Sequence, residues 1–249
     1  MSDPQKLEVT WTRYAQLVEV VSWNTLRVKI DVGFHCWRRV AANITEGWFQ
    51  SPSESEDFVR KWFEGHDSLI VRTRKVAEPR GLVVAYVVQV QGRNLQTGER
   101  DDLLYDLTRA MRPHAKKQPE KPATLEVDWI FPADMIRLVD GDTQEFEVDA
   151  GFHTDRRITD RLLGVNCPET KGASRPAGLA ASDFSRQWYE GHDEIIIQTR
   201  PDPKHWTDSF RRYLVRVQGR NLTTGAREDL AQSLLAAKHA VPFMEEQSK

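Results

Sequence analysis

Residues 138–171 read LVDGDTQEFEVDAGFHTDRRITDRLLGVNCPETK and decide the fold of the second half of the chain. Apolar and polar residues alternate on both sides of the DGDT segment at 140–143, which is typical of antiparallel strands joined by a turn. Pro168 ends the strand that runs through RLLGV, because proline cannot donate to a strand ladder. We therefore expect this stretch to form the opening strands of a β-rich domain.

The rest of this half adds helices and two further strands. A helix is predicted near 176–190, strands at 194–200 and 212–218, and a closing helix over 227–240. The residues expected on the apolar face of the first helix are Leu179, Phe184, Trp188 and Tyr189. Five or more strands with two or three helices per half predict a mainly β fold with α-helices (α+β), built on a five-stranded barrel of the OB type.

The same framework occurs twice in the chain. Three segments of the first half recur in the same order in the second, and the second copy is longer around KGASRPAGLAA. Repeats of this length are duplicated domains, since solenoid units are roughly 20–50 residues long. The matched pairs are LEVTW at 7–11 with LEVDW at 125–129, FVRKWFEGHD at 58–67 with FSRQWYEGHD at 184–193, and VQGRNLQTG at 90–98 with VQGRNLTTG at 217–225.

Two tandem domains are therefore expected, at residues 1–113 and 125–249, joined by a polar linker at 114–124. No apolar run approaches the roughly 20 residues that cross a bilayer, and the first residues lack a signal-peptide pattern. Cys36 and Cys167 stand at non-equivalent repeat positions, which argues against a disulfide framework. We expect a soluble, cytoplasmic protein that does not bind membranes.

Charge is divided unevenly between the halves. The whole chain carries a net charge of −2, which argues against a general nucleic-acid coat. Residues 1–124 hold 19 Lys+Arg and 16 Asp+Glu, and residues 125–249 hold 16 and 21. A solvated surface explains this difference, and so does a division of labour in which the basic half holds a polyanion.

Residue types suited to phosphate chemistry gather in the second copy. Asp140 and Asp142 lie in the turn, Arg161 on a predicted strand, Glu169 just past that strand, and Arg212 far downstream. A hard cation needs oxygen ligands, and a phosphodiester under attack needs positive charge and a base. Asp-Gly alone is also a hairpin signal, and Glu169 alone would be an exposed loop acid. Their joint occurrence favours a site.

These segments resemble the staphylococcal nuclease family. DGDT at 140–143, RLLGVNCPETKG at 161–172, the following helix and DSFRRYLVRV at 208–217 occur in the family order, and the resemblance covers residues 133–242. It implies an OB-type barrel carrying helices, and calcium-dependent hydrolysis of DNA and RNA. Together with the internal repeat, it makes the chain a tandem duplication whose first copy is expected to be degenerate.

The resemblance assigns roles to residues of this chain. Asp142, Asn166 and the backbone carbonyl of Cys167 match the Ca²⁺ ligands, and Glu169 matches a glutamate that acts through a water. The two phosphate-binding arginines of the family match Arg161 and Arg212.

Three positions depart from the family pattern or add to it. Asn166 stands where the family usually has a second aspartate, so the site loses a charge. Arg211 stands where a glycine precedes the second arginine, and its side chain would either strain the backbone or contact phosphate. Trp206 lies in the preceding loop, where it would stack on a base or pack against its own domain.

The first copy lacks the residues of the site. Its framework is kept, including His66 in the EGHD segment, which we interpret as a structural helix cap like His192. The replacements are Asn24 for Asp142, Asn43 for Arg161, Trp48 for Asn166, Ser51 for Glu169 and Ala85 for Arg212.

Two hypotheses follow. In the first, the second domain is a Ca²⁺-dependent nuclease acting on DNA or RNA, single-stranded by expectation, and the first domain binds nucleic acid, a protein partner or a second copy of the chain. In the second, both domains are degenerate barrels of a non-catalytic binding or assembly protein.

Overall fold

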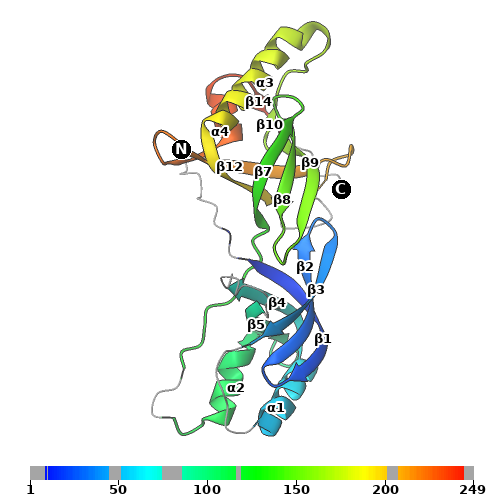
Figure 1. Ribbon diagram of the computed structural model, residues 1–249, viewed down its shortest axis with the longest axis vertical. Helices are drawn as coiled ribbons and strands as arrows, with labels where there is room; N and C mark the ends of the chain where they lie inside the picture. Colours follow the sequence, from blue (N-terminus) through cyan, green and yellow to red (C-terminus); the bar gives the residue numbers. More distant parts are fainter. Residues whose placement is uncertain are drawn as a thin grey trace. The chain divides into compact units, whose positions relative to one another are not determined.

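The computed structural model describes residues 9, 11–44, 52–74, 86–115, 119–200 and 207–243. The chain divides into two compact units, one of Thr10–Asp128 and one of Trp129–Lys249 together with Met1–Val9 (Figure 1). Each unit combines a mostly antiparallel sheet with helices, so the expectation of a mainly β, α+β fold is confirmed.

The Trp129–Lys249 unit contains a closed five-stranded barrel. Strands β7, β8 and β9 pair antiparallel in sequence, β9 pairs in parallel with β12, β12 pairs with β11, and β11 returns to β7. The barrel strands are β7 (Ile130–Leu138), β8 (Thr143–Asp149), β9 (Asp155–Leu162), β11 (His192–Thr199) and β12 (Tyr213–Asn221). The remaining elements are β10 (Val165–Asn166), the 3₁₀ turn η1 (Gly172–Ser174), α3 (Arg175–Glu190), β13 (Arg227–Asp229), α4 (Leu230–Ala236) and β14 (Val241–Pro242).

The Thr10–Asp128 unit repeats this order of elements. From one edge of its sheet to the other, the strands lie in the order β3, β2, β1, β4, β5 and β6, and β3 also pairs in parallel with β5. The elements are β1 (Thr12–Ser22), β2 (Thr25–Gly33), β3 (Cys36–Asn43), α1 (Pro52–Glu64), β4 (His66–Arg74), β5 (Tyr86–Asn94), β6 (Arg100–Asp102) and α2 (Leu103–Met111).

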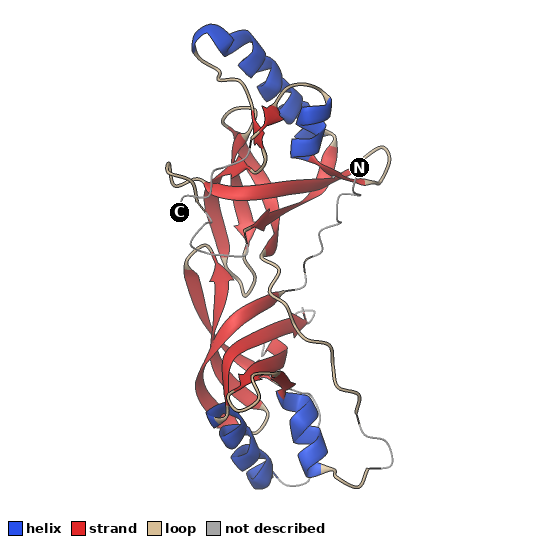
Figure 2. Ribbon diagram, turned by 180° about the vertical axis from the view of Figure 1, so that it is seen from behind, coloured by secondary structure: helices blue, strands red, loops and turns tan. Residues whose placement is uncertain are grey.

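In each unit the helices gather at one end of the sheet (Figure 2). Buried apolar side chains fill the interior of the sheet, with Phe146, Val148 and Ile197 fully buried in the second unit. Among the described residues, none of the helices has the length and apolar character needed to cross a membrane.

Helix α3 forms where the sequence predicts a helix, but its buried face differs from the expected one. Trp188 and Tyr189 are buried as expected, whereas Leu179 is 40% exposed. Small residues form the rest of the buried face, namely Gly178, Ala181, Ser182 and Ser185. Apolar periodicity missed this face because the helix packs closely against backbone, where large side chains do not fit.

The predicted closing helix is shorter than expected. Residues 227–229 form β13 and pair with β12, and α4 begins only at Leu230. Asp229 caps the helix, since its carboxylate accepts a hydrogen bond from the backbone N–H of Gln232 at 3.1 Å. The matching Asp102 caps α2 through the N–H of Tyr105 at 3.0 Å.

Each unit includes the segment that comes, along the chain, just before the first strand of the other unit. Val9 packs against Ile130 and Ile196 of the second unit. Leu125 is buried, and its N–H donates to the Gln91 side chain of the first unit at 2.8 Å. The unit boundary therefore lies after Asp128, four residues beyond the linker that the sequence predicts at 114–124.

Asp128 holds this lead-in segment in the first unit. Its carboxylate accepts from the guanidinium of Arg13, which is fully buried, at 2.9 Å. We expect Asp128→Ala to lower the free energy of unfolding by about 3 kcal/mol, because removing one partner leaves a buried charge less well compensated. Urea denaturation would measure it, with Glu126→Ala in the same segment as an exposed control. Equal stability of the two variants would contradict this role.

Candidate active site

The DGDT turn places Asp142 at the start of β8. The N–H groups of Val139 and Asp140 both donate to the carbonyl of Thr143, at 2.9 and 3.1 Å, which closes the turn. The Asp140 carboxylate accepts from the N–H of Asp142 at 3.1 Å. The hairpin interpretation and the site interpretation of this segment are therefore compatible, since the turn fixes the direction of the Asp142 side chain.

Asp142 is a buried carboxylate with several hydrogen bonds. It is 3% exposed, and it accepts from the N–H of Cys167 at 2.8 Å and from the hydroxyl of Thr143 at 3.2 Å. Burial raises the pKa of Asp142, and the charge of Asp140 adds to the rise, against the opposing effects of Cys167 and Arg161. Negative charge here is thus incompletely compensated by the protein, which favours an added cation.

Arg161 binds the side chains of both Asp142 and Asn166, the two residues expected to bind a cation through side-chain oxygens. From the end of β9, its guanidinium donates to Asp142 at 3.2 Å and to the side-chain oxygen of Asn166 at 2.6 Å. Its outer face lies 5.5 Å from the ring centroid of Phe243. Phe243 is held there because β14 pairs with β10, the strand that carries Asn166.

Arg212 enters the same network from the turn before β12. Asp208 binds it through a side-chain pair at 2.7 Å, and the Arg212 guanidinium also donates to the hydroxyl of Thr143 at 3.2 Å. Burial opposes ionisation of Asp208, but the hydrogen bonds from Arg212 lower its pKa overall. The ring of Phe210, which is 78% exposed, lies 5.3 Å from the guanidinium carbon.

The parallel pairing of β9 with β12 brings these arginines together. Leu214 lies opposite Arg161 in the register, and Thr143 lies opposite Arg161 in the antiparallel pairing of β8 with β9. Thr143 thus contacts Asp142 and Arg212 through one hydroxyl. Two guanidinium groups, one buried carboxylate and one amide oxygen form a connected group at one end of the barrel.

Glu169 lies on the loop after β10, with an exposed side chain. Helix α3 supports this loop from behind, since a Cβ atom at Gly178 would overlap the backbone carbonyl of Glu169. The same helix supports the DGDT turn, because the Ser185 hydroxyl donates to the carbonyl of Gly141 at 2.7 Å. The small-residue face of α3 therefore sets the positions of both loops.

The remaining expected site residues have different outcomes. Burial raises the pKa of Cys167 to about 12, so its thiol stays protonated and its backbone is the group available to the site. Arg211 is exposed and has a φ of 62°, a left-handed backbone conformation that is strained for any residue with a Cβ atom. Trp206 lies outside the described residues, as do Trp48, Ser51 and Ala85 of the first copy.

A buried polar group behind the site was missed by sequence reasoning. Asp160 is fully buried beside Arg161, and the Gln144 amide donates to it at 2.5 Å. Among the described residues, Gln144 Oε1, Asp160 Oδ1 and the Tyr189 hydroxyl have no hydrogen-bond partner. The signal was present in the repeat, since the first copy has the apolar residues Leu26 and Ala42 at the places of Gln144 and Asp160.

The first copy keeps the geometry of the turn without its charges. The Thr25 hydroxyl lies 3.1 Å from the Asn24 side-chain oxygen and 3.0 Å from that of Asn43. These asparagines replace Asp142 and Arg161. These neutral side chains offer no charge to a phosphate or to a cation.

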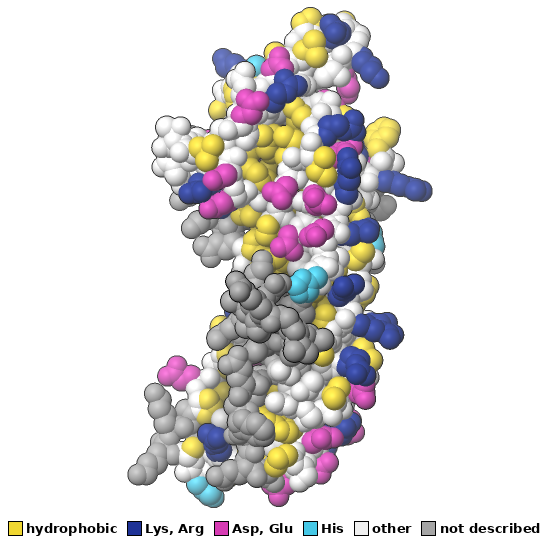
Figure 3. Space-filling view, viewed as in Figure 1, with side chains coloured by type: hydrophobic (Ala, Val, Ile, Leu, Met, Phe, Trp, Pro, Cys, Tyr) yellow, Lys and Arg dark blue, Asp and Glu magenta, His cyan; other side chains and the backbone are white. Residues whose placement is uncertain are grey.

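A separate pocket of about 600 Å³ opens at the other end of the β8–β9 hairpin. Carboxylates gather on this face of the second unit (Figure 3). Those that line the pocket are Asp134, Glu147, Asp149, Asp155, Asp193 and Glu194. Negative charge of this density repels a polyanion, so the arginine end of the barrel is the better candidate for anion binding.

Neither a scan of protein-family models nor a search of curated proteins found a match for this chain.

Gly178 provides a test of how α3 positions the Glu169 loop. Gly178→Ala places a methyl group against the Glu169 carbonyl, so we expect the loop to shift and the free energy of unfolding to fall by roughly 1–3 kcal/mol. Chemical denaturation and a crystal structure of the variant would measure both effects. The control is Ala180→Gln, a change to another good helix former on the exposed side of the same helix. An unmoved loop in the variant would contradict this account.

Asp160 predicts a pH dependence of stability. Burial holds the pKa of Asp160 well above its ordinary range in the folded state. Between the ordinary pKa, roughly 4, and the raised one, only the unfolded chain loses the proton, so stability falls by up to about 1.4 kcal/mol per pH unit as the pH rises. Asp160→Asn does not titrate, and its stability relative to the wild type should increase from pH 4 to pH 7.

Denaturation at several pH values would check this prediction. Asp183→Asn, at a side chain that is 62% exposed, serves as the control. A difference between Asp160→Asn and the wild type that stays constant with pH would refute the prediction.

Proposed function

We propose that the second unit is a Ca²⁺-dependent nuclease of the staphylococcal nuclease type, which hydrolyses phosphodiester bonds of DNA or RNA. The observation that carries the proposal is the convergence of Arg161 and Arg212 on Thr143 and Asp142, with Glu169 on the adjoining loop. A phosphate held by both guanidinium groups would lie near a carboxylate that faces solvent.

The two arginines suit the binding of a phosphodiester. Guanidinium groups match the oxygens of phosphate in pairs, and both arginines are partly shielded from water, at 12% and 24% side-chain exposure. Asp142 and Asn166 bind Arg161, and Asp208 binds Arg212, so both guanidinium groups are kept close to the site. Positive charge fixed in advance at this place stabilises the charge that develops on the phosphate during attack.

Exposed aromatic rings beside the arginines favour a nucleic-acid substrate. Phe210 and Phe243 each lie next to one of the two guanidinium groups, with exposures of 78% and 40%. Rings in this position can stack on bases whose phosphates are bound by the arginines. Stacking requires unpaired bases, which supports a single-stranded substrate.

The residues present fit a hard divalent cation. Asp142 supplies a buried carboxylate, Asn166 an amide oxygen and residue 167 a backbone carbonyl, with Asp140 adding negative charge nearby. Ca²⁺ binds oxygen ligands of these kinds, and the single direct carboxylate predicts modest affinity. When bound, the ion would supply Lewis-acid polarisation of the phosphate.

Glu169 has the role of the base. Its carboxylate is exposed on the loop that α3 supports, so it can accept a proton from a water without being desolvated first. Arg161 would turn from Asn166 toward the phosphate, and Arg212 would keep its bond to Asp208 while it binds. The two arginines then stabilise the negative charge that develops on the phosphate oxygens when the water attacks.

We also interpret the two units as tandem OB-like barrels, of which the first has lost its chemistry. The neutral Asn24 and Asn43 support this interpretation. The first unit would then hold nucleic acid, a protein partner or a second copy of the chain. Both cysteines are unpaired, which is compatible with the cytoplasm.

A non-catalytic binding protein is the second candidate. The observation in its favour is that both arginines already have carboxylate partners, Asp142 for Arg161 and Asp208 for Arg212. Such pairing can serve structure alone. Binding of a single strand by Phe210 and the arginines would need neither Glu169 nor a cation.

Nuclease activity of purified full-length protein on single-stranded DNA and RNA would decide between them. We expect cleavage with Ca²⁺ and loss of cleavage with EDTA. Glu169→Gln should lower the rate by roughly 10²–10⁴-fold, and Arg212→Gln by on the order of 10²-fold or more. Because Glu169 is exposed, its replacement should leave the melting temperature unchanged.

The matched control is Glu147→Gln, an exposed acid at the opposite end of the hairpin, which should keep full activity. Cleavage by Glu169→Gln at the wild-type rate would exclude the assigned base. Binding of a single strand without cleavage in any divalent ion would favour the second candidate.

A further inference from the structure

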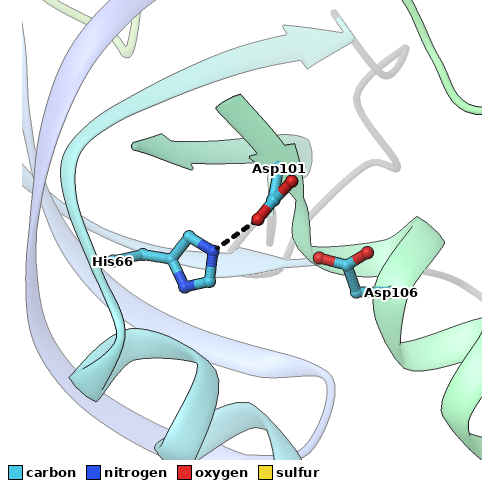
Figure 4. Close-up of side chains that lie close together, drawn as sticks. All are labelled: His66, Asp101 and Asp106. Atoms are coloured by element: carbon cyan, nitrogen blue, oxygen red, sulfur yellow. Dashed lines mark hydrogen bonds and ion pairs between the residues drawn. The ribbon is translucent and has the colours of Figure 1, made fainter. Parts of the chain in front are cut away.

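The first unit contains a cluster that the second unit lacks. His66 lies at the start of β4, Asp101 on β6 and Asp106 on α2, and their ligand atoms all lie within 4.8 Å of one another. Figure 4 shows the three side chains converging from three separate elements. We propose that His66, Asp101 and Asp106 form a binding site for Zn²⁺.

The imidazole is oriented as a metal ligand. Nδ1 of His66 lies 2.6 Å from the carbonyl of Trp62, so this nitrogen carries a proton and donates it. The ring is also stacked on the Trp62 indole at 3.9 Å. Nε2, the other ring nitrogen, faces Asp101, and a donated Nδ1–H is the usual support of a histidine that binds a metal through Nε2.

The carboxylates are placed for the same ion. Nε2 of His66 lies 3.1 Å from Asp101 Oδ2. This distance is close to the roughly 3.4 Å that separates two ligand atoms bound about 2.0–2.2 Å from a tetrahedral zinc ion. Asn94 donates to the same Asp101 oxygen at 2.8 Å, and Trp62 donates its indole N–H to Asp106 at 2.9 Å. Each carboxylate therefore has a supporting hydrogen bond and keeps lone pairs for a cation.

The surrounding charge favours a cation at this place. His66 and Asp101 are mostly buried, with side chains 8% and 22% exposed. Asp102 adds a further negative charge close to Asp106. Lys121 reaches the outer oxygen of Asp101 at 3.6 Å, which compensates part of the charge from the solvent side.

Comparison with the second unit shows which contacts of His66 occur in both copies and which residue of the cluster occurs in the first copy alone. His192 repeats the stacking on Trp188, the bond to its carbonyl and a carboxylate contact to Glu228 at 3.1 Å. These shared features fit the structural role that the sequence suggests for both histidines. At the place of Asp106, however, the second unit has Ser233, which accepts the indole N–H at 3.2 Å.

The second carboxylate of the cluster, Asp106, thus distinguishes the two copies. Trp62 needs only an acceptor, and a serine satisfies the matching indole in the second unit, so the hydrogen bond alone does not call for an acid. An imidazole with two carboxylates is a ligand set for zinc-class ions, and it differs from the all-oxygen set near Asp142. A bound ion would cross-link α2, β6 and the start of β4.

Calorimetric titration of metal-free, reduced full-length protein with Zn²⁺ tests the proposal. The wild type should bind one equivalent with a dissociation constant in the micromolar range or below. Asp106→Asn keeps an acceptor for Trp62 and removes the charged ligand, so it should fold normally and bind at least about 10-fold more weakly. Ser233→Ala, at the matching position of the second unit, should bind like the wild type.

Co²⁺ in place of zinc gives a second readout. The wild type should show the visible absorption of a four-coordinate ion with nitrogen and oxygen ligands, and Asp106→Asn should lose it. An intense thiolate band would place the ion on Cys36 or Cys167 and overturn the proposal. Equal zinc affinity of Asp106→Asn and the wild type, or no binding by the wild type, would also overturn it.

Discussion

The parallel pairing of β9 with β12 is the interaction on which the candidate active site depends. These strands are separated in sequence by the loop after β10, helix α3 and strand β11, and their pairing closes the five-stranded barrel. Closure places Arg212 beside Thr143, which already contacts Asp142. Without that pairing the two arginines would belong to unrelated parts of the surface, and no single phosphate could reach both.

Because the chain is duplicated, a described polar residue of one copy can be compared with the residue at the matching position of the other. Features shared by both copies belong to the framework, such as the aspartate caps of α2 and α4 and the histidines stacked on Trp62 and Trp188. Features confined to one copy are candidates for function. Asp142 and Arg161 are confined to the second copy, and Asp106 to the first. If both proposals hold, the two units have diverged in the cations that their residues are suited to bind.

Burial of polar groups differs between the copies in the same way. The first copy has Leu26 and Ala42 in its interior, where the second has Gln144 and Asp160. A fully buried carboxylic acid lowers stability at neutral pH, because the folded chain must either bury the charge or hold a proton that the unfolded chain releases. Asp160 precedes Arg161 in β9. A residue that lowers the stability of the second unit therefore lies close to the candidate site, as is common where function constrains a fold.

Local pattern in the sequence was sufficient for the barrel strands of the second unit, the DGDT turn and the position of α3, because these depend on alternation, on turn residues and on a helical period. It did not separate the short strand β13 from the closing helix. The residues Asp142, Asn166, Arg161 and Arg212 were also chosen from sequence, and the structure brings all four into one network. Sequence could not give the small-residue face of α3, since that face depends on how closely the helix approaches the backbone at Gly141 and Glu169. Nor could it give the exchanged lead-in segments, the carboxylate pair of Arg212 or the approach of Asp106 to His66. Contacts between residues far apart in the chain are decided by barrel closure and close packing, which only the tertiary structure fixes.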